Sequence, residues 1–383
     1  MRDVYVLGLL VSLAACSDPV AESTASATTV GGGGATSGTG ATGGAGGGGG
    51  SGAAPPVGNS PLEMVASSMA PGDFVQFPVP TFGEWLGSYD VAWMSKMYYD
   101  PMRHHMWIGG KRAASQGSRM ALVEYDGPMD AWQLVYDSDD DGYPLGESLG
   151  HIYEALTVDV STGAPVFKIF NSTNLARFDG SAWVQLNTAE QPNGWSTPAA
   201  ATAYHPNLFG DGAPGIVVGA VDGIYGYDPA TDESTLIAGG WSSGGYTNAI
   251  NYNPIQDCVF VTKDSTPEIY RVRRASEGAV RIADAPIELG PHSSSAMGKL
   301  VSAPGGEELV FERIGSNVWT WVEDPAPSGT WELSSTANPF PTDTGFWFPE
   351  HVYARGVIWA LVFQDNTAEQ PPQSYLWKPP TDL

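Results

Sequence analysis

The sequence predicts an all-β fold, a β-propeller of six blades with seven as the alternative count. Three observations support it. Short apolar runs separated by Gly, Pro, Asn and Asp recur from residue 72 onward, without the period of an amphipathic helix. The runs return about every fifty residues. Each repeat holds three to four of them, which is the content of one propeller blade.

The most apolar run of each repeat sets the register. These runs begin at residues 106, 165, 216, 258, 308 and 357. A second run with an aromatic residue follows each of them, as at Tyr125, Phe178 and Tyr227. A further strand is expected after it, and another before each apolar run, as at 201–204 and 249–252. A lone blade leaves both faces apolar, so closing the blades into a ring is the arrangement that buries them.

The last repeat ends without room for its outermost strand. Residues 73–77 read Asp-Phe-Val-Gln-Phe, a short apolar segment that lies outside the six repeats. We therefore expect this N-terminal segment to complete the last blade and hold the ring shut. The alternative fold is a β-sandwich or jelly roll in which the repeat spacing is accidental.

Two segments resemble known propeller repeats. Gly109-Gly110, Tyr125 and Trp132 are similar to the kelch repeat of galactose-oxidase-type propellers, a resemblance that implies aromatic residues packed between blades. Residues 209–220 resemble the FG-GAP repeat, another propeller unit, but lack that family's calcium-binding aspartates. Both resemblances imply the same fold.

The first sixty residues differ from the rest of the chain. Residues 4–15 form an apolar run of signal-peptide length, and the residues up to Cys16 read Leu-Ala-Ala-Cys, which resembles the bacterial lipobox. The resemblance implies a lipoprotein signal peptide at 1–15 and lipidation of Cys16. It also implies sorting to the outer membrane, because Ser17 follows. A cleaved secretory signal without lipid is the alternative.

Residues 16–60 are rich in Gly, Ser, Thr and Ala and show no apolar periodicity. Such a chain buries too little surface to offset its backbone entropy, so we expect a disordered linker. Its reach would be roughly 35–40 Å for a Gly-rich coil. The propeller domain is then expected over residues 61–383.

The composition of the chain limits the classes of molecule that it is expected to bind. The formal net charge is −25, which repels nucleic acid. The chain has two cysteines, so lipidation of Cys16 would leave Cys258 without a disulfide partner. Cys258 lies in an apolar run, which predicts a buried thiol.

One acidic loop has the spacing of a calcium site. Asp137, Asp139 and Asp141 occupy positions 1, 3 and 5, and Gly142 occupies position 6. Position twelve is Ser148 instead of Glu, and no helix flanks the loop. The two interpretations are a calcium site and a solvated acidic turn. Calcium is the only cofactor that the sequence suggests.

A ligand pocket is expected where the first strands of the repeats begin. In a propeller these positions face the mouth of the central channel. The residues at or near them are Tyr89, His151, Trp195, Tyr246 and His292. By contrast, His104 and His105 follow Pro101 at a turn and are expected to be exposed.

The sequence contains no nucleophile elbow, no phosphate-binding loop and no His-x-x-x-His pair. We therefore predict a non-catalytic binding or scaffolding propeller, anchored by lipid at the cell surface or in the periplasm, with a protein or glycan partner. The alternative is a secreted hydrolase or lyase with its site at the channel mouth. Three ionisable groups meeting at the axis would favour the enzyme.

Overall fold

The computed structural model divides the chain into residues 1–51 and residues 52–383, and every residue described below belongs to the second unit. The described residues are 60–77, 89–90, 97–100, 103–112, 119–126, 131–137, 154–169, 171–196, 200–240, 249–263, 266–287, 289, 298–312, 315–322, 329–341, 346–352, 355–363 and 372–381.

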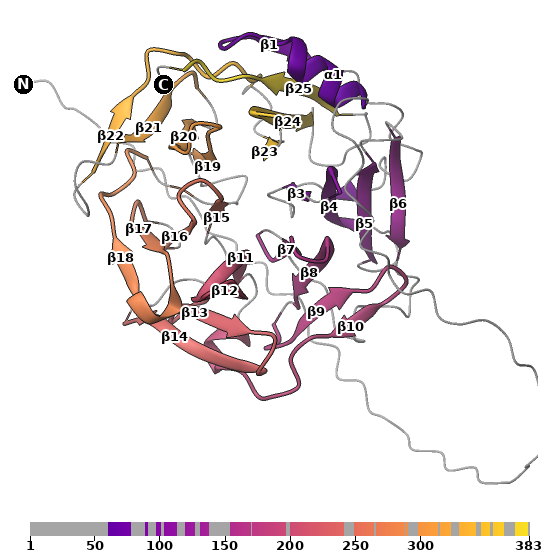
Figure 1. The fold of residues 1–383 in the computed structure, drawn as a ribbon, viewed down its shortest axis with the longest axis vertical. Coiled ribbons are helices and arrows are strands. Elements are labelled where there is room, and N and C mark those ends of the chain that lie inside the picture. The colour runs from indigo at the N-terminus through magenta and orange to yellow at the C-terminus, as the bar shows by residue number, and fades with distance from the viewer. Residues whose placement is uncertain are drawn as a thin grey trace, which may run out of the picture. The chain divides into compact units, whose positions relative to one another are not determined.

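The second unit is a six-bladed β-propeller, as predicted, and the alternative of seven blades is wrong. Six antiparallel sheets follow one another around a common centre (Figure 1). The first sheet comprises β2 (Tyr89–Asp90), β3 (Tyr98–Asp100), β4 (His105–Arg112), β5 (Arg119–Asp126) and β6 (Ala131–Asp137). The second comprises β7 (Leu156–Asp159), β8 (Ala164–Lys168), β9 (Leu175–Phe178) and β10 (Trp183–Gln185).

The next three blades have the same order from the centre outward. The third contains β11 (Ala201–Gly210), β12 (Ala213–Gly219), β13 (Gly223–Asp228) and β14 (Glu233–Gly239). The fourth contains β15 (Ile250–Asn253), β16 (Cys258–Thr262), β17 (Ile269–Val272) and β18 (Ala279–Arg281). The fifth contains β19 (Gly298–Ser302), β20 (Glu308–Glu312), β21 (Val318–Val322) and β22 (Thr330–Leu333).

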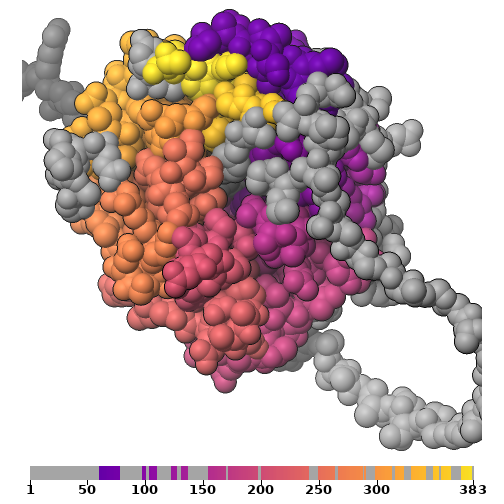
Figure 2. Space-filling model, viewed as in Figure 1, coloured from indigo at the N-terminus to yellow at the C-terminus, as the bar shows by residue number. Residues whose placement is uncertain are grey.

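The sixth blade is completed by the N-terminal segment, which confirms the predicted strand exchange. Its own strands are β23 (Phe346–Val352), β24 (Val357–Phe363) and β25 (Gln373–Trp377), and β1 (Phe74–Gln76) is the outermost. Val75 lies opposite Leu376 in this antiparallel pair. The first and last segments of the described chain therefore lie side by side (Figure 2).

A short helix precedes this strand and was not predicted from the sequence. Helix α1 (Pro61–Ser68) begins with a capping box, in which Ser60 and Glu63 exchange hydrogen bonds. At its other end, the Lys378 Nζ atom donates to the Met69 carbonyl oxygen at 2.8 Å, so the last blade caps the helix. Within the described ranges no helix is long and apolar enough to span a membrane.

Helix α1 is tied to the ring by a buried ion pair. The Arg355 guanidinium, between β23 and β24, donates to the Glu63 carboxylate, and both side chains are almost fully buried. His104, from the turn between β3 and β4, lies 3.4 Å from the same carboxylate. Glu63 therefore contacts groups of both the sixth and the first blade, where the ring closes.

The core consists of six apolar clusters, each filling one interface between neighbouring blades. At the closure, Trp359 of β24 packs edge-on against Tyr125 of β5, with ring centroids 4.9 Å apart. Trp132 of β6 and Phe77 contact the same indole. Aromatic residues thus pack between these blades, as the resemblance to propeller repeats implied. Cys258 is fully buried in another cluster, as predicted.

Candidate functional site

Only one of the side chains predicted to line the channel mouth lies among the described residues. Trp195 lies in the 3-10 helix η4 (Asn193–Ser196), and its side chain is fully buried. It packs edge-on against Tyr225 and Tyr227 between the second and third blades. The structure therefore places Trp195 in the core, because its indole fills the gap between two sheets. Tyr89 lies in β2, and its side chain is not described.

The other predicted site residues lie outside the described residues: Cys16, Asp139, Asp141, His151, Tyr246 and His292. Asp137 is the last residue of β6, and its side chain is likewise not described. In the ranges that are described, no group of three His, Cys, Asp or Glu side chains is arranged to hold a metal ion.

Three buried ionisable side chains lie on or next to inner strands. Tyr98 on β3 and Glu350 on β23 belong to inner strands, and Glu154 lies two residues before the inner strand β7. Burial, together with the charges of both carboxylates, raises the pKa of Tyr98 well above that of a free tyrosine. The Oε2 atom of Glu154 is buried without a hydrogen-bond partner among the described residues.

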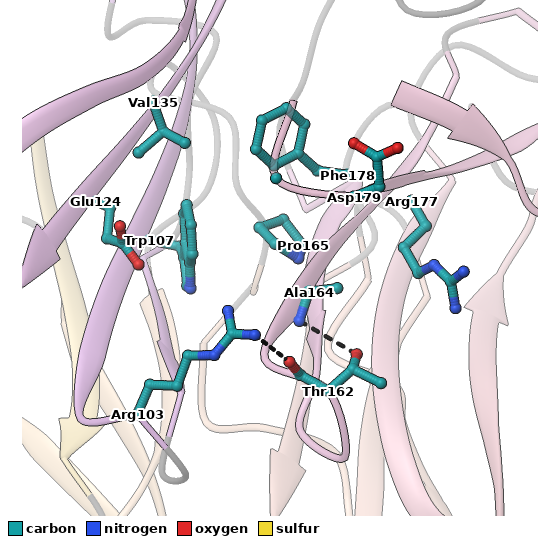
Figure 3. A pocket seen from close by; sticks show the side chains of 11 residues that line it. Arg103, Trp107, Glu124, Val135, Thr162, Ala164, Pro165, Arg177, Phe178 and Asp179 are labelled. Atoms are coloured by element: carbon teal, nitrogen blue, oxygen red, sulfur yellow. Dashed lines mark hydrogen bonds between the residues drawn. The ribbon is translucent and has the colours of Figure 1, made fainter. Parts of the chain in front are cut away.

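A pocket of about 510 Å³ lies between the first and second blades. It is at the end of the ring where β3 turns into β4, β7 into β8 and β9 into β10, so it is opposite the starts of the inner strands. One wall carries Trp107, Glu124 and Val135 of the first blade (Figure 3). The other carries Pro165 and Phe178 of the second blade.

Two arginines contribute positive charge to this pocket, and they lie on opposite sides of Ala164 (Figure 3). Arg103, in the β3–β4 turn, is about half exposed. Its Nη1 and Nη2 atoms donate to the carbonyl oxygens of Gly163 at 3.1 Å and Thr162 at 2.5 Å. These bonds hold the guanidinium in place, because two points on one planar group fix its orientation. Arg177, on β9, is exposed.

The two carboxylates that line the pocket are held by donors of their own blades. Glu124 accepts a hydrogen bond from His105, and Gln133 lies 3.4 Å from its other oxygen. Asp179 accepts from the backbone N–H groups of Ser181 and Ala182, which lowers the pKa of its carboxyl. Glu124 thus has a histidine beside it, whereas Asp179 is an exposed carboxylate whose lowered pKa keeps it charged at neutral pH.

His104 and His105 are not exposed, contrary to the expectation from the sequence. His104 is buried against Tyr99, whose hydroxyl lies 3.2 Å from its Nδ1 atom. His105 is half-buried beside Glu124 and Asp126. Burial opposes a charge on the His105 ring, but the hydrogen bond and charge of Glu124 outweigh it and raise the pKa of His105 above its ordinary value.

This ion pair predicts a pH-dependent contribution to stability. Because the folded-state pKa of His105 is raised, its contribution is full below about pH 6.5 and is lost as the pH rises through the raised pKa. We expect His105→Gln to reduce the free energy of unfolding more at about pH 6 than at about pH 9. Urea unfolding at both pH values measures the free energy of unfolding. The control is Glu190→Gln, a substitution of an exposed residue. Equal losses at both pH values would contradict the prediction.

This pocket is not among the sites that the sequence predicts. Trp107 lies in one of the predicted apolar strands, and Phe178 lies at a predicted aromatic position of a repeat. Their role in one pocket depends on how the first two blades meet. The only available signal was the presence of two arginines, Arg103 and Arg177, near apolar strand residues in a chain with few basic residues.

No protein-family model and no curated protein matches this sequence. Similar solved structures include an auxiliary nutrient binding protein from Bacteroides ovatus, with 14% identity and a TM-score of 0.49 over 80% of this chain and 76% of the other. Another from Bacteroides thetaiotaomicron has 12% identity and a TM-score of 0.45 over 76% and 69%. Virginiamycin B lyase from Staphylococcus aureus has 13% identity and a TM-score of 0.43 over 75% and 81%. The function must therefore be argued from the residues of this chain.

Proposed function

We propose that this protein is a binding propeller that takes a glycan in the pocket between its first and second blades. The observation that carries the proposal is the composition of that pocket. Apolar walls from Trp107, Pro165 and Phe178 lie beside hydrogen-bonding groups from Arg103 and Glu124. A few placed polar groups among apolar walls are typical of small-ligand sites.

The size of the pocket favours a glycan over a protein partner. Its volume of about 510 Å³ lies within the range of roughly 300–1,000 Å³ for sites that bind small molecules. A stable protein interface instead buries about 800 Å² of surface on each partner, and it does not need a pocket of this size.

The proposal includes attachment to the outer membrane through lipid on Cys16. The support is the lipobox-like sequence that ends at this residue. Incorporation of radiolabelled palmitate is expected in the native chain and absent in Cys16→Ser. A native chain that takes up no label would refute the anchor and leave the binding proposal intact.

Filling the pocket is expected to abolish binding. Ala164 lines the pocket at the start of β8, and Ala213 has the equivalent position at the start of β12 in the third blade. On an array of immobilised oligosaccharides, Ala164→Phe should lose the glycans that the native protein binds, because a benzyl group occupies their space. Ala213→Phe should retain them.

Two results would contradict the proposal. One is binding of the same glycans by Ala164→Phe at unchanged strength, and the other is no glycan bound by the native protein. Circular dichroism and the unfolding temperature of both variants show whether each has the native fold.

A second function is favoured by three ionisable groups on or next to inner strands. Glu154, Glu350 and Tyr98 are all buried, and the charges of both carboxylates act on Tyr98, so groups that could serve as acid and base are present. If the protein is an enzyme, it should cleave a glycan that it binds, and Glu154→Gln should reduce turnover by 100-fold or more on the order of general acid–base effects. Chromatography of the bound glycans after incubation shows whether they are cleaved. If the glycans stay intact, the enzymatic function is excluded.

A further inference from the structure

We propose that the surface which holds residues 60–77 also accepts the same segment from a second copy of this protein, so that two copies pair by exchanging these segments. Residues 60–77 comprise α1 and β1 and are called the strap. The inference does not depend on the glycan pocket. It is carried by the origin of the strap's contacts, by the apolar surface that the strap covers, and by the fit of that surface to the strap's own sequence.

The strap is held by residues from the other end of the chain. Arg355, 292 positions from Glu63, donates to the Glu63 carboxylate. The Lys378 Nζ atom, 309 positions from Met69, donates to the Met69 carbonyl oxygen. β1 adds three residues paired with β25 (Figure 1). The same contacts with a second copy would be chemically identical, which is the condition for domain swapping.

The length of chain between the strap and the ring allows such an exchange. Residues 78–88 join β1 to β2, and eleven residues can span at most roughly 36–40 Å. In a single copy this link holds the strap near its own surface, at an effective concentration on the order of millimolar. Exchange is therefore favoured where copies are crowded, as the proposed lipid anchor on Cys16 would crowd them.

The surface under the strap is too apolar to stay open. Leu62, Ala66, Met69 and Phe77 of the strap are almost fully buried in the cluster between the sixth and first blades. Phe77 packs edge-on against Trp359, with ring centroids 5.7 Å apart. Release of the strap would expose these groups together with the edge of β25, and both features promote association. A vacated surface is therefore refilled, by its own strap or by that of a neighbour.

The occupant that fits this surface is the strap sequence itself. Arg355 is almost fully buried and needs a carboxylate, which Glu63 supplies from the third residue of α1. Lys378 donates to the carbonyl oxygens of Ala66 and Met69, which are available because they lie at the end of a helix. β25 then needs a strand that follows this helix. A second copy provides all three features at the correct spacing.

The test joins two copies by a disulfide across the β1–β25 pair. Gln76 and Tyr375 lie opposite each other in this pair, and Gln76 is exposed. Chains with Gln76→Cys and chains with Tyr375→Cys, which carry different tags and both contain Cys16→Ser, are refolded together from urea at high concentration and oxidised. A covalent dimer that contains both tags is expected.

The matched control mixes Gln76→Cys with Leu333→Cys, an exposed position on β22. The first mixture should give at least about tenfold more mixed dimer than the control, because a disulfide needs Cα atoms held about 4.4–6.8 Å apart. Refolding at a tenfold lower concentration should reduce the dimer fraction about tenfold, since pairing of two copies follows mass action.

A chain that carries both Gln76→Cys and Tyr375→Cys is the reference for the geometry, and it should form the disulfide internally. If this reference is oxidised but the first mixture gives no more mixed dimer than the control, the strap does not exchange and the inference is wrong. A reference chain that forms no internal disulfide would also overturn it, since the strap would then not lie on β25.

A fluorescent peptide with the sequence of residues 60–77 gives a second measurement on the whole protein. Fluorescence anisotropy should show at least about tenfold tighter binding to Glu63→Ala than to the native protein, because a loss of about 1.4 kcal/mol in the protein's own strap already has this effect. Equal binding to the two proteins, or none to either, would contradict the exchange.

Discussion

Replacing Glu63 by Ala is expected to lower the free energy of unfolding by about 3–5 kcal/mol, because it leaves the Arg355 guanidinium buried without its carboxylate. The change also removes half of the capping box of α1 and the acidic neighbour of His104. The effect is large because one side chain holds the N-terminal helix against two blades. Urea unfolding at neutral pH measures it.

The control is the double replacement Glu63→Leu with Arg355→Met, which removes both charges and keeps apolar volume. It should cost less than Glu63→Ala alone, since no charge is left buried. The explanation fails if Glu63→Ala changes stability by less than about 0.5 kcal/mol, the scale of ordinary surface substitutions.

Replacing Trp359 by Ala should destabilise the fold by about 3–5 kcal/mol, the usual cost of removing a large aromatic residue from a core. Trp359 is fully buried and contacts Tyr125 and Trp132 of the first blade and Phe77 of the N-terminal segment. Its Nε1 atom also donates to Ser374 Oγ at 2.6 Å. The cavity would therefore open where the ring closes.

Trp359→Phe is the matched comparison. It keeps an aromatic ring but loses the hydrogen bond to Ser374 and part of the volume, so it should cost less than the Ala change. Thermal unfolding curves of the two variants, fitted separately, show which variant loses more stability. Equal losses in the two variants would show that packing at the closure does not depend on the volume of this indole.

The blades were predictable because the apolar runs along the chain mark where the strands lie. The run at 258–261 is buried on both faces as β16, and the five related runs became the second strands of the other blades. Residues 73–77 hold three apolar residues and lie outside the repeats, which was sufficient to predict their place beside β25. Such patterns are local, so no tertiary information was needed.

Helix α1 and the pocket could not be predicted in the same way. The helix is only eight residues long, and its position depends on distant partners, Arg355 and Lys378. The capping sequence from Ser60 to Glu63 is a local signal for the start of this helix. The pocket is formed where two separate sheets meet, and no repeat pattern contains the angle between them. For Trp195 the sequence position was misleading. Its place before a first strand suggested a ligand contact, but its large indole is part of the core.

The pairing of β1 with β25 has a consequence for biosynthesis. Residues 74–76 are synthesised long before residues 373–377, so this strand pair joins segments that are about three hundred residues apart in the chain. Closing so long a loop is entropically slow compared with forming hairpins inside a single module. The nascent polypeptide therefore cannot form this strand pair until residues 373–377 have been synthesised.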